Sequence, residues 1–193
     1  IFSNVCRTIA YAHNRGVIHR DIKPSNIAIG SYGEVMVIDW GLGTTPTTSS
    51  ENTSVNAMAP DSKHHDASQT MHGDYQGTPN YMSPEQVTGD TVSCSSDIYS
   101  LGGVLFSILT AQPPRNVGSQ SVPLSELFDA IVSGDIPTPE SVEPSIPIEL
   151  GAIVNKAMQR DPERRYQDVT SLLADLQAVM VDETIVICPD TIP

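Results

Sequence analysis

Basic residues are scarce in this sequence. Its 193 residues include 10 lysines and arginines against 23 aspartates and glutamates, which gives a formal net charge of −13 at pH 7. Because proteins bind a phosphate backbone mainly through lysine and arginine, this imbalance argues against a nucleic-acid partner.

Cysteines are few as well, and long apolar runs are absent. Cys6, Cys94 and Cys188 are odd in number and far apart, which favours free thiols in a reducing cytoplasm over a disulfide or zinc framework. The most apolar stretch, residues 102–109, is much shorter than the roughly 20 residues that a transmembrane helix needs. We therefore expect a cytoplasmic chain that makes no membrane contact of its own.

Two short segments carry polar residues in a pattern that suits catalysis. Residues 19–26 are His-Arg-Asp-Ile-Lys-Pro-Ser-Asn, and residues 39–41 are Asp-Trp-Gly. Two β-forming runs joined by a glycine-containing turn lie between them, which predicts an antiparallel hairpin. Because a hairpin brings its outer ends together, Asn26 and Asp39 should become neighbours.

The side chains of these segments suit a divalent cation that bridges phosphates. Asn26 and Asp39 supply oxygen ligands, while Asp21 and Lys23 add a carboxylate and an ammonium group nearby. Phosphoryl transfer needs such an arrangement, because it depends on positioning and charge stabilisation more than on covalent chemistry by the protein.

The same residues resemble the catalytic loop and metal-binding triplet of protein kinases. Residues 77–85, Gly-Thr-Pro-Asn-Tyr-Met-Ser-Pro-Glu, resemble the substrate-docking loop of eukaryotic-like serine/threonine kinases of bacteria. The resemblance implies ATP and Mg²⁺ as cofactors and a protein substrate that receives the γ-phosphate on serine or threonine. Asp21 would orient the hydroxyl and take its proton, and Lys23 would neutralise the moving phosphate. Asn26 and Asp39 would hold magnesium.

The resemblance also implies roles for residues outside these two segments. Thr78 would bridge the catalytic aspartate and lysine through its hydroxyl, although an ordinary Gly-Thr-Pro turn is the alternative. Asp97 would accept backbone hydrogens from the catalytic loop. Glu85 would form a buried ion pair with Arg165. Apart from the resemblance, we expect Arg115 to lie at the surface.

In kinases, the part of the chain that corresponds to residues 39–85 is the activation segment. Residues 44–72 within it are polar and aperiodic, and we expect most of them to be disordered. For residues 44–66, a tolerated surface insertion is favoured over a regulatory loop.

Arg20, next to the catalytic aspartate, suggests control by a phosphate on the activation segment, because a buried guanidinium needs an anion. Ser68 and Thr70 are the best candidates for the phosphorylated residue. A structural ion pair with a carboxylate is the alternative role of Arg20.

Apolar residues at helical spacing cover much of the remaining chain. The predicted helices span residues 1 to about 14, a stretch capped within 95–97 and ending near 110, residues 125–133, a stretch around 150–158, and a last helix whose apolar stripe runs from Val169 to Met180. Prolines between residues 137 and 147 are expected to form the connection to the helix around 150–158.

These elements predict an α+β, mainly helical fold that resembles the C-terminal lobe of a protein kinase with a small catalytic hairpin. Residues 1–181 would form this lobe, and residues 182–193 a tail or linker. The glycine-rich loop and strand lysine of the kinase N-terminal lobe are missing from the sequence, so we expect a fragment that is inactive alone.

The alternative function is a pseudokinase or truncated remnant that acts as a non-catalytic protein-interaction scaffold. Loss of Asp21, Asn26 or Asp39 would support that alternative, and all three residues are present. Sequence upstream of Ile1 would distinguish the two, because a glycine-rich loop and a strand lysine there would favour catalysis.

Overall fold

The structure is a computed structural model that describes residues 1–40, 79–115 and 123–181. Both the polar stretch 44–72 and the predicted tail 182–193 lie outside these ranges. The helices are α1 (Phe2–Asn14), α2 (Pro84–Thr88), α3 (Cys94–Thr110), α4 (Leu124–Ser133), α5 (Pro139–Val142), α6 (Ile148–Ala157) and α7 (Val169–Met180), with 3-10 turns η1 (Pro24–Asn26), η3 (Pro79–Tyr81) and η4 (Pro162–Arg164).

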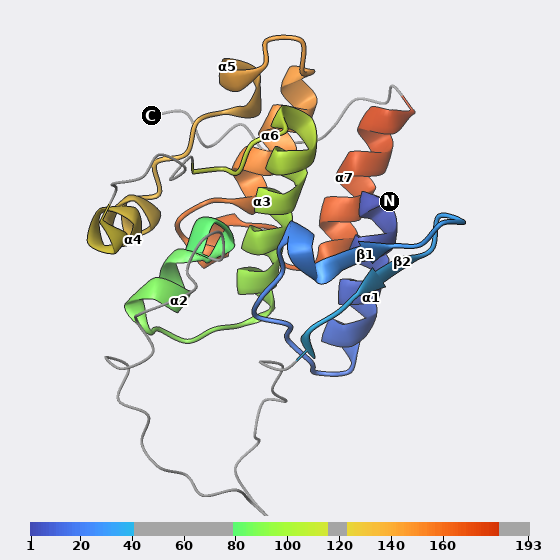
Figure 1. Cartoon of the computed structure of the whole chain (residues 1–193), viewed down its shortest axis with the longest axis horizontal. Coiled ribbons are helices and arrows are strands. Elements are labelled where there is room, and N and C mark those ends of the chain that lie inside the picture. Colours follow the sequence, from blue (N-terminus) through green and yellow to red (C-terminus); the bar gives the residue numbers. More distant parts are fainter. Residues whose placement is uncertain (41–78, 116–122, 182–193) are drawn as a thin grey trace, which may run out of the picture.

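Helix α3 is the central element of the described structure (Figure 1). It is apolar on most of its faces, and such a helix is stable only where neighbouring elements cover it. Helix α6 comes very close at Gly102, where an added Cβ would lie 2.6 Å from Cγ of Met158 and 2.8 Å from Cβ of Ala157. Helices α1 and α7 pack against each other, and buried side chains of α1, α3, α6 and α7 form one core.

The start of α3 differs from the prediction, which placed its cap within residues 95–97. Ser93 is the N-cap, because its Oγ accepts from the backbone N–H of Ser95 at 3.3 Å and its own N–H donates to Oγ of Ser96 at 3.2 Å. Asp97 therefore lies inside the first turn, where its carboxylate is not needed as the cap.

The predicted hairpin is present, formed by β1 (Ile27–Ile29) and β2 (Val35–Val37). The strands are antiparallel, with Ile27 opposite Val37 and Ile29 opposite Val35. Gly33 in the turn has φ 87°, a left-handed conformation that glycine adopts without steric cost. The described chain is thus mainly helical with one small antiparallel sheet, which confirms the predicted α+β class.

Several details were not predicted or differ from the prediction. The proline-rich connection contains the short helix α5, which begins at Pro139, a position where a missing N–H costs nothing. Met180 is 73% exposed, since α7 ends beyond the core. Arg115 is buried at 7% exposure, because its guanidinium lies over the ring of Tyr99 and donates to its hydroxyl at 2.7 Å.

None of the described helices combines the length and the apolar character that a membrane crossing requires.

Candidate active site

Asp97 anchors the start of the segment that carries the predicted catalytic residues. Its Oδ2 accepts from the backbone N–H of His19 and its Oδ1 from that of Arg20, each at 2.8 Å. Nε2 of His13, at the end of α1, lies 2.8 Å from the same Oδ2. Asp97 is completely buried, and these partners satisfy its carboxylate. The segment is therefore tied to α3 at the point where α1 ends.

Arg20 has an uncommon backbone conformation, with φ 71°. A residue with a Cβ rarely adopts this left-handed region, and about 1–3 kcal/mol is needed to hold it there. Its N–H is held by Asp97, and its carbonyl accepts from Nε2 of Gln86 at 2.7 Å. The next N–H, that of Asp21, donates to Nδ1 of His19 at 3.2 Å. The peptide that leads into Asp21 is thus fixed from both sides.

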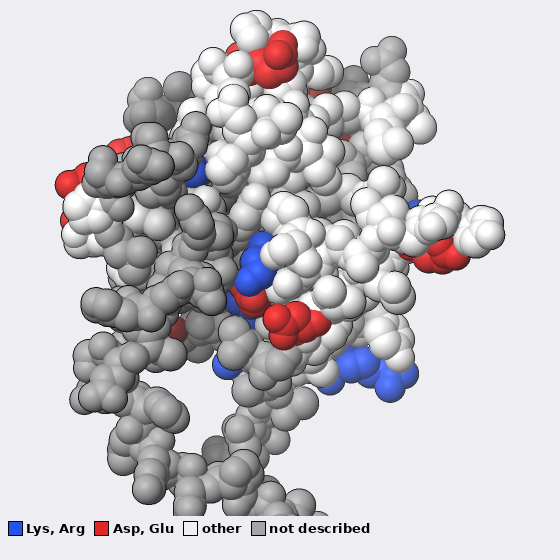
Figure 2. Space-filling model, viewed as in Figure 1, with Lys and Arg blue, Asp and Glu red and all other residues white. Residues whose placement is uncertain are grey.

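Three predicted site residues meet directly after this peptide. Nζ of Lys23 lies 2.8 Å from Oδ2 of Asp21. The Nδ2 group of Asn26 donates to the same Oδ2 at 3.0 Å and to the backbone carbonyl of Asp21 at 2.8 Å. Figure 2 shows basic and acidic atoms side by side near the middle of this face, between the hairpin and α2.

Asp39 follows the second strand, as predicted, and lies near Asn26. The strand pairing continues one step past Val37, because the N–H of Ile38 donates to the carbonyl of Asn26 at 2.9 Å. Asp39 itself is exposed and has φ 64°, so the chain turns sharply at this carboxylate.

Trp40 packs against residues 19–26, which carry the predicted catalytic residues and are called the catalytic segment below. Its Nε1 donates to the carbonyl of Val37 at 2.9 Å, and its ring centroid lies 4.5 Å from that of His19. Nε2 of His19 in turn lies 3.1 Å from the carbonyl of Ile38. These contacts hold the two segments of the site together.

The oxygen atoms available at this site fit magnesium bound jointly with a nucleotide. Because Nδ2 of Asn26 is occupied with Asp21, its Oδ1 is the atom suited to a cation. Asp39 directly follows Ile38, whose N–H donates to the Asn26 carbonyl. Mg²⁺ typically takes only one or two protein ligands and completes its shell with water and substrate phosphates. Over the described ranges, no three or more His, Cys, Asp or Glu side chains form a metal cage.

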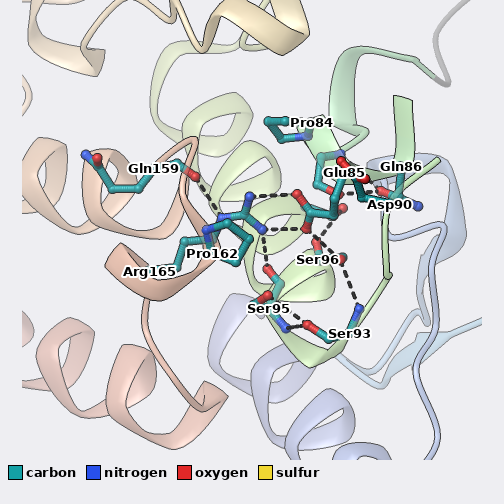
Figure 3. Close-up of polar contacts among 12 residues, drawn as sticks. Pro84, Glu85, Gln86, Asp90, Ser93, Ser95, Ser96, Gln159, Pro162 and Arg165 are labelled. Carbon is teal, nitrogen blue, oxygen red and sulfur yellow. Dashed lines mark hydrogen bonds and ion pairs between the residues drawn. The ribbon is translucent and has the colours of Figure 1, made fainter. Parts of the chain in front are cut away.

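Glu85, in α2, and Arg165, directly after η4, form a bidentate ion pair (Figure 3). The guanidinium donates from Nη1 to Oε1 at 2.7 Å and from Nη2 to Oε2 at 2.8 Å, and Oγ of Ser96 adds a bond of 2.6 Å. Arg165 also donates to three backbone carbonyls. Glu85 and Arg165 are only 6% and 2% exposed, so the pair is shielded from water.

Burial by itself would raise the pKa of Glu85, but the hydrogen bonds from Arg165 and Ser96 and the charge of Arg165 outweigh it. Together they hold the pKa of this carboxyl below its ordinary value. Glu85 therefore stays charged at neutral pH and needs its cationic partner.

Thr78, Ser68 and Thr70 lie outside the described residues. Nε of Arg20 is buried and has no hydrogen-bond partner among the residues that the structure describes.

Two residues that position the site were not predicted from the sequence. His13 contacts Asp97, and Gln86 contacts the carbonyl of Arg20. His13 carries no motif of its own. For Gln86, the only available signal was its place directly after the Ser-Pro-Glu sequence.

Known serine/threonine protein kinases are similar to most of this chain. The serine/threonine-protein kinase PknD of Chlamydia caviae is 36% identical over 181 residues, which are 92% of this chain and 18% of that protein. PknB of Mycobacterium leprae is 36% identical over 176 residues, covering 91% of this chain and 25% of the relative. The chain therefore spans only a minor part of the length of these relatives.

The protein kinase domain family matches residues 1–176. Since this match runs from α1 into α7 and takes in every described residue of the site, the chain belongs to the protein kinase family.

Proposed function

We propose that the chain forms the C-terminal lobe of a serine/threonine protein kinase domain. The complete protein that carries it would transfer the γ-phosphate of ATP to serine or threonine hydroxyls of protein substrates. The observation that carries this proposal is the cluster of Asp21, Lys23 and Asn26, joined at 2.8–3.0 Å, with Asp39 at the end of the neighbouring strand.

Each side chain of the cluster has a chemical role in this proposal. Lys23 and Asn26 both contact Oδ2 of Asp21, so we assign the substrate hydroxyl and its proton to Oδ1. The ammonium group of Lys23 would neutralise charge on the moving phosphate, with Thr78 bridging it to Asp21. Asn26 and Asp39 would hold Mg²⁺, which when bound neutralises the nucleotide phosphates.

The direct test is phosphate transfer by the complete protein. With Mg²⁺, ATP labelled at the γ-phosphate and a generic protein substrate, we expect label on phosphoserine and phosphothreonine. If the protein binds ATP or a partner protein but transfers no label, the scaffold alternative replaces the proposal.

Asp39→Ala is expected to weaken binding of magnesium–ATP by about tenfold or more, because it removes a charged oxygen ligand of the cation. Titration of a fluorescent ATP analogue with and without Mg²⁺ measures this. The matched control is Asp135→Ala, at an exposed aspartate outside the site. Equal affinities of Asp39→Ala and wild type in the presence of Mg²⁺ would contradict the assigned role.

We further propose that a phosphate on Ser68 or Thr70 reaches Arg20 and activates the kinase. Nε of Arg20 is buried and has no hydrogen-bond partner within residues 1–40, 79–115 and 123–181, which supports an anion as its partner. Phosphopeptide mapping of the active protein should find modification at residues 68 or 70. Modification confined to residues 44–54 would count against this proposal.

A further inference from the structure

The side chain of Gln86 connects two parts of the site that are far apart in the sequence. Its Oε1 accepts from the backbone N–H of Ser83 at 3.0 Å and from the Ser83 hydroxyl at 3.1 Å. Its Nε2 donates to the backbone carbonyl of Arg20 at 2.7 Å, although the two residues are 66 positions apart. One amide thus joins the start of α2 to the catalytic segment.

Helix capping explains only the contacts with Ser83. Ser83 and Gln86 form a capping box, in which a glutamine at the third helical position reaches back to the N–H of the cap residue. That role uses Oε1 alone. Glutamate serves equally well in a capping box, so the cap does not require the N–H donor that contacts Arg20.

The carbonyl that accepts the hydrogen bond from Gln86 is that of Arg20, whose backbone has the left-handed conformation. Arg20 has φ 71°, and its N–H is already held by buried Asp97. The bond from Gln86 holds the other end of the same residue, directly before Asp21. A conformation of this kind persists only when the surrounding contacts impose it.

Neighbouring residues of α2 reach in different directions. Glu85 pairs with Arg165, which follows η4, while Gln86 lies on the far side of Glu85 from Arg165 (Figure 3). Glu85 thus connects the start of α2 to Arg165 after η4, and Gln86 connects it to Arg20 in the catalytic segment.

We propose that Gln86 is a positioning residue for phosphate transfer. Through the carbonyl of Arg20 it holds the backbone that aims Asp21, and so makes the catalytic geometry depend on the placement of α2. This inference rests on the kinase function proposed above. Gln86 would act on the rate of transfer and not on nucleotide binding, because it contacts the backbone directly before Asp21, the proposed proton acceptor.

The test uses two variants of the complete protein. Gln86→Glu keeps an oxygen for the capping box but has no N–H to donate to Arg20, whereas Gln86→Leu removes both contacts. Gln177→Glu, at an exposed position of α7, is the matched control for the added charge. For each variant, kcat, the KM for ATP, the melting temperature and amide hydrogen exchange of residues 18–22 are measured.

We expect Gln86→Glu to lower kcat by about tenfold or more, with KM for ATP and melting temperature close to wild type. Exchange of the amides in residues 18–22 should rise in both Gln86 variants and stay unchanged in Gln177→Glu.

If Gln86→Glu keeps wild-type kcat and exchange while Gln86→Leu only melts earlier, Gln86 is a cap and the inference is overturned. A lower kcat without faster exchange overturns the route through Arg20. If wild type transfers no phosphate, the proposed kinase function fails, and the exchange measurement alone then decides whether Gln86 holds this backbone.

Discussion

Asp21→Asn in the complete protein should abolish phosphate transfer and leave ATP binding largely intact. Asparagine keeps the shape of the side chain, but its amide does not accept the substrate proton and offers no charge to Lys23, whose Nζ lies 2.8 Å from Oδ2 of Asp21. Loss of a general base typically costs a factor of about 10²–10⁴ in rate. Single-turnover phosphate transfer and a nucleotide titration measure the two quantities separately.

Asp135→Asn makes the same chemical change at an exposed position and should transfer phosphate at the wild-type rate. A near wild-type rate for Asp21→Asn would refute the role of Asp21 as base. Together, Asp21→Asn and Asp39→Ala distinguish the proposed proton acceptor, Asp21, from the proposed cation ligand, Asp39. The first should change turnover and the second nucleotide binding.

Arg165→Ala should destabilise the domain by about 3–5 kcal/mol, because it leaves the Glu85 carboxylate buried without a cation. Arg165 also donates to three backbone carbonyls, so its loss should cost more than Glu85→Ala. Denaturant titrations of the complete protein measure the change. The matched control is Arg164→Ala, whose side chain is 63% exposed and is expected to have little effect.

The double variant Glu85→Ala/Arg165→Ala should lose less stability than the sum of the two single variants. Once one partner is gone, removing the other no longer strands a buried charge, so the energies of contacting residues do not add. Additive losses would show that the pair is not coupled in solution, despite the 2.7 Å between Nη1 and Oε1.

The sequence by itself determined most local elements and pointed to the residues proposed for catalysis. The hairpin was predictable because β-forming runs and a glycine turn are local signals, and the hairpin in turn places Asn26 beside Asp39. Most helices were predictable from apolar spacing, which repeats within each segment. Asp21, Lys23 and Asn26 were found through their motif, since all three lie within one short stretch.

The family resemblance implied the bonds from Asp97 to this stretch, whereas tertiary structure alone added the contacts of His13 and Gln86. His13 and Asp97 are 84 positions apart, and Gln86 and Arg20 are 66, so no local pattern links them. The left-handed conformation of Arg20 results from bonds to α3 and α2, not from its own preference.

Burial of Arg115 was likewise decided by packing. A lone arginine in a proline-rich loop gives no sign that an aromatic ring lies beside it. The loop after α3 brings the guanidinium of Arg115 over Tyr99, with its carbon 5.9 Å from the ring centroid and Nη2 donating to the ring hydroxyl at 2.7 Å. A periodic pattern reports which face of an element is apolar, whereas burial of a single polar side chain depends on which element packs against it.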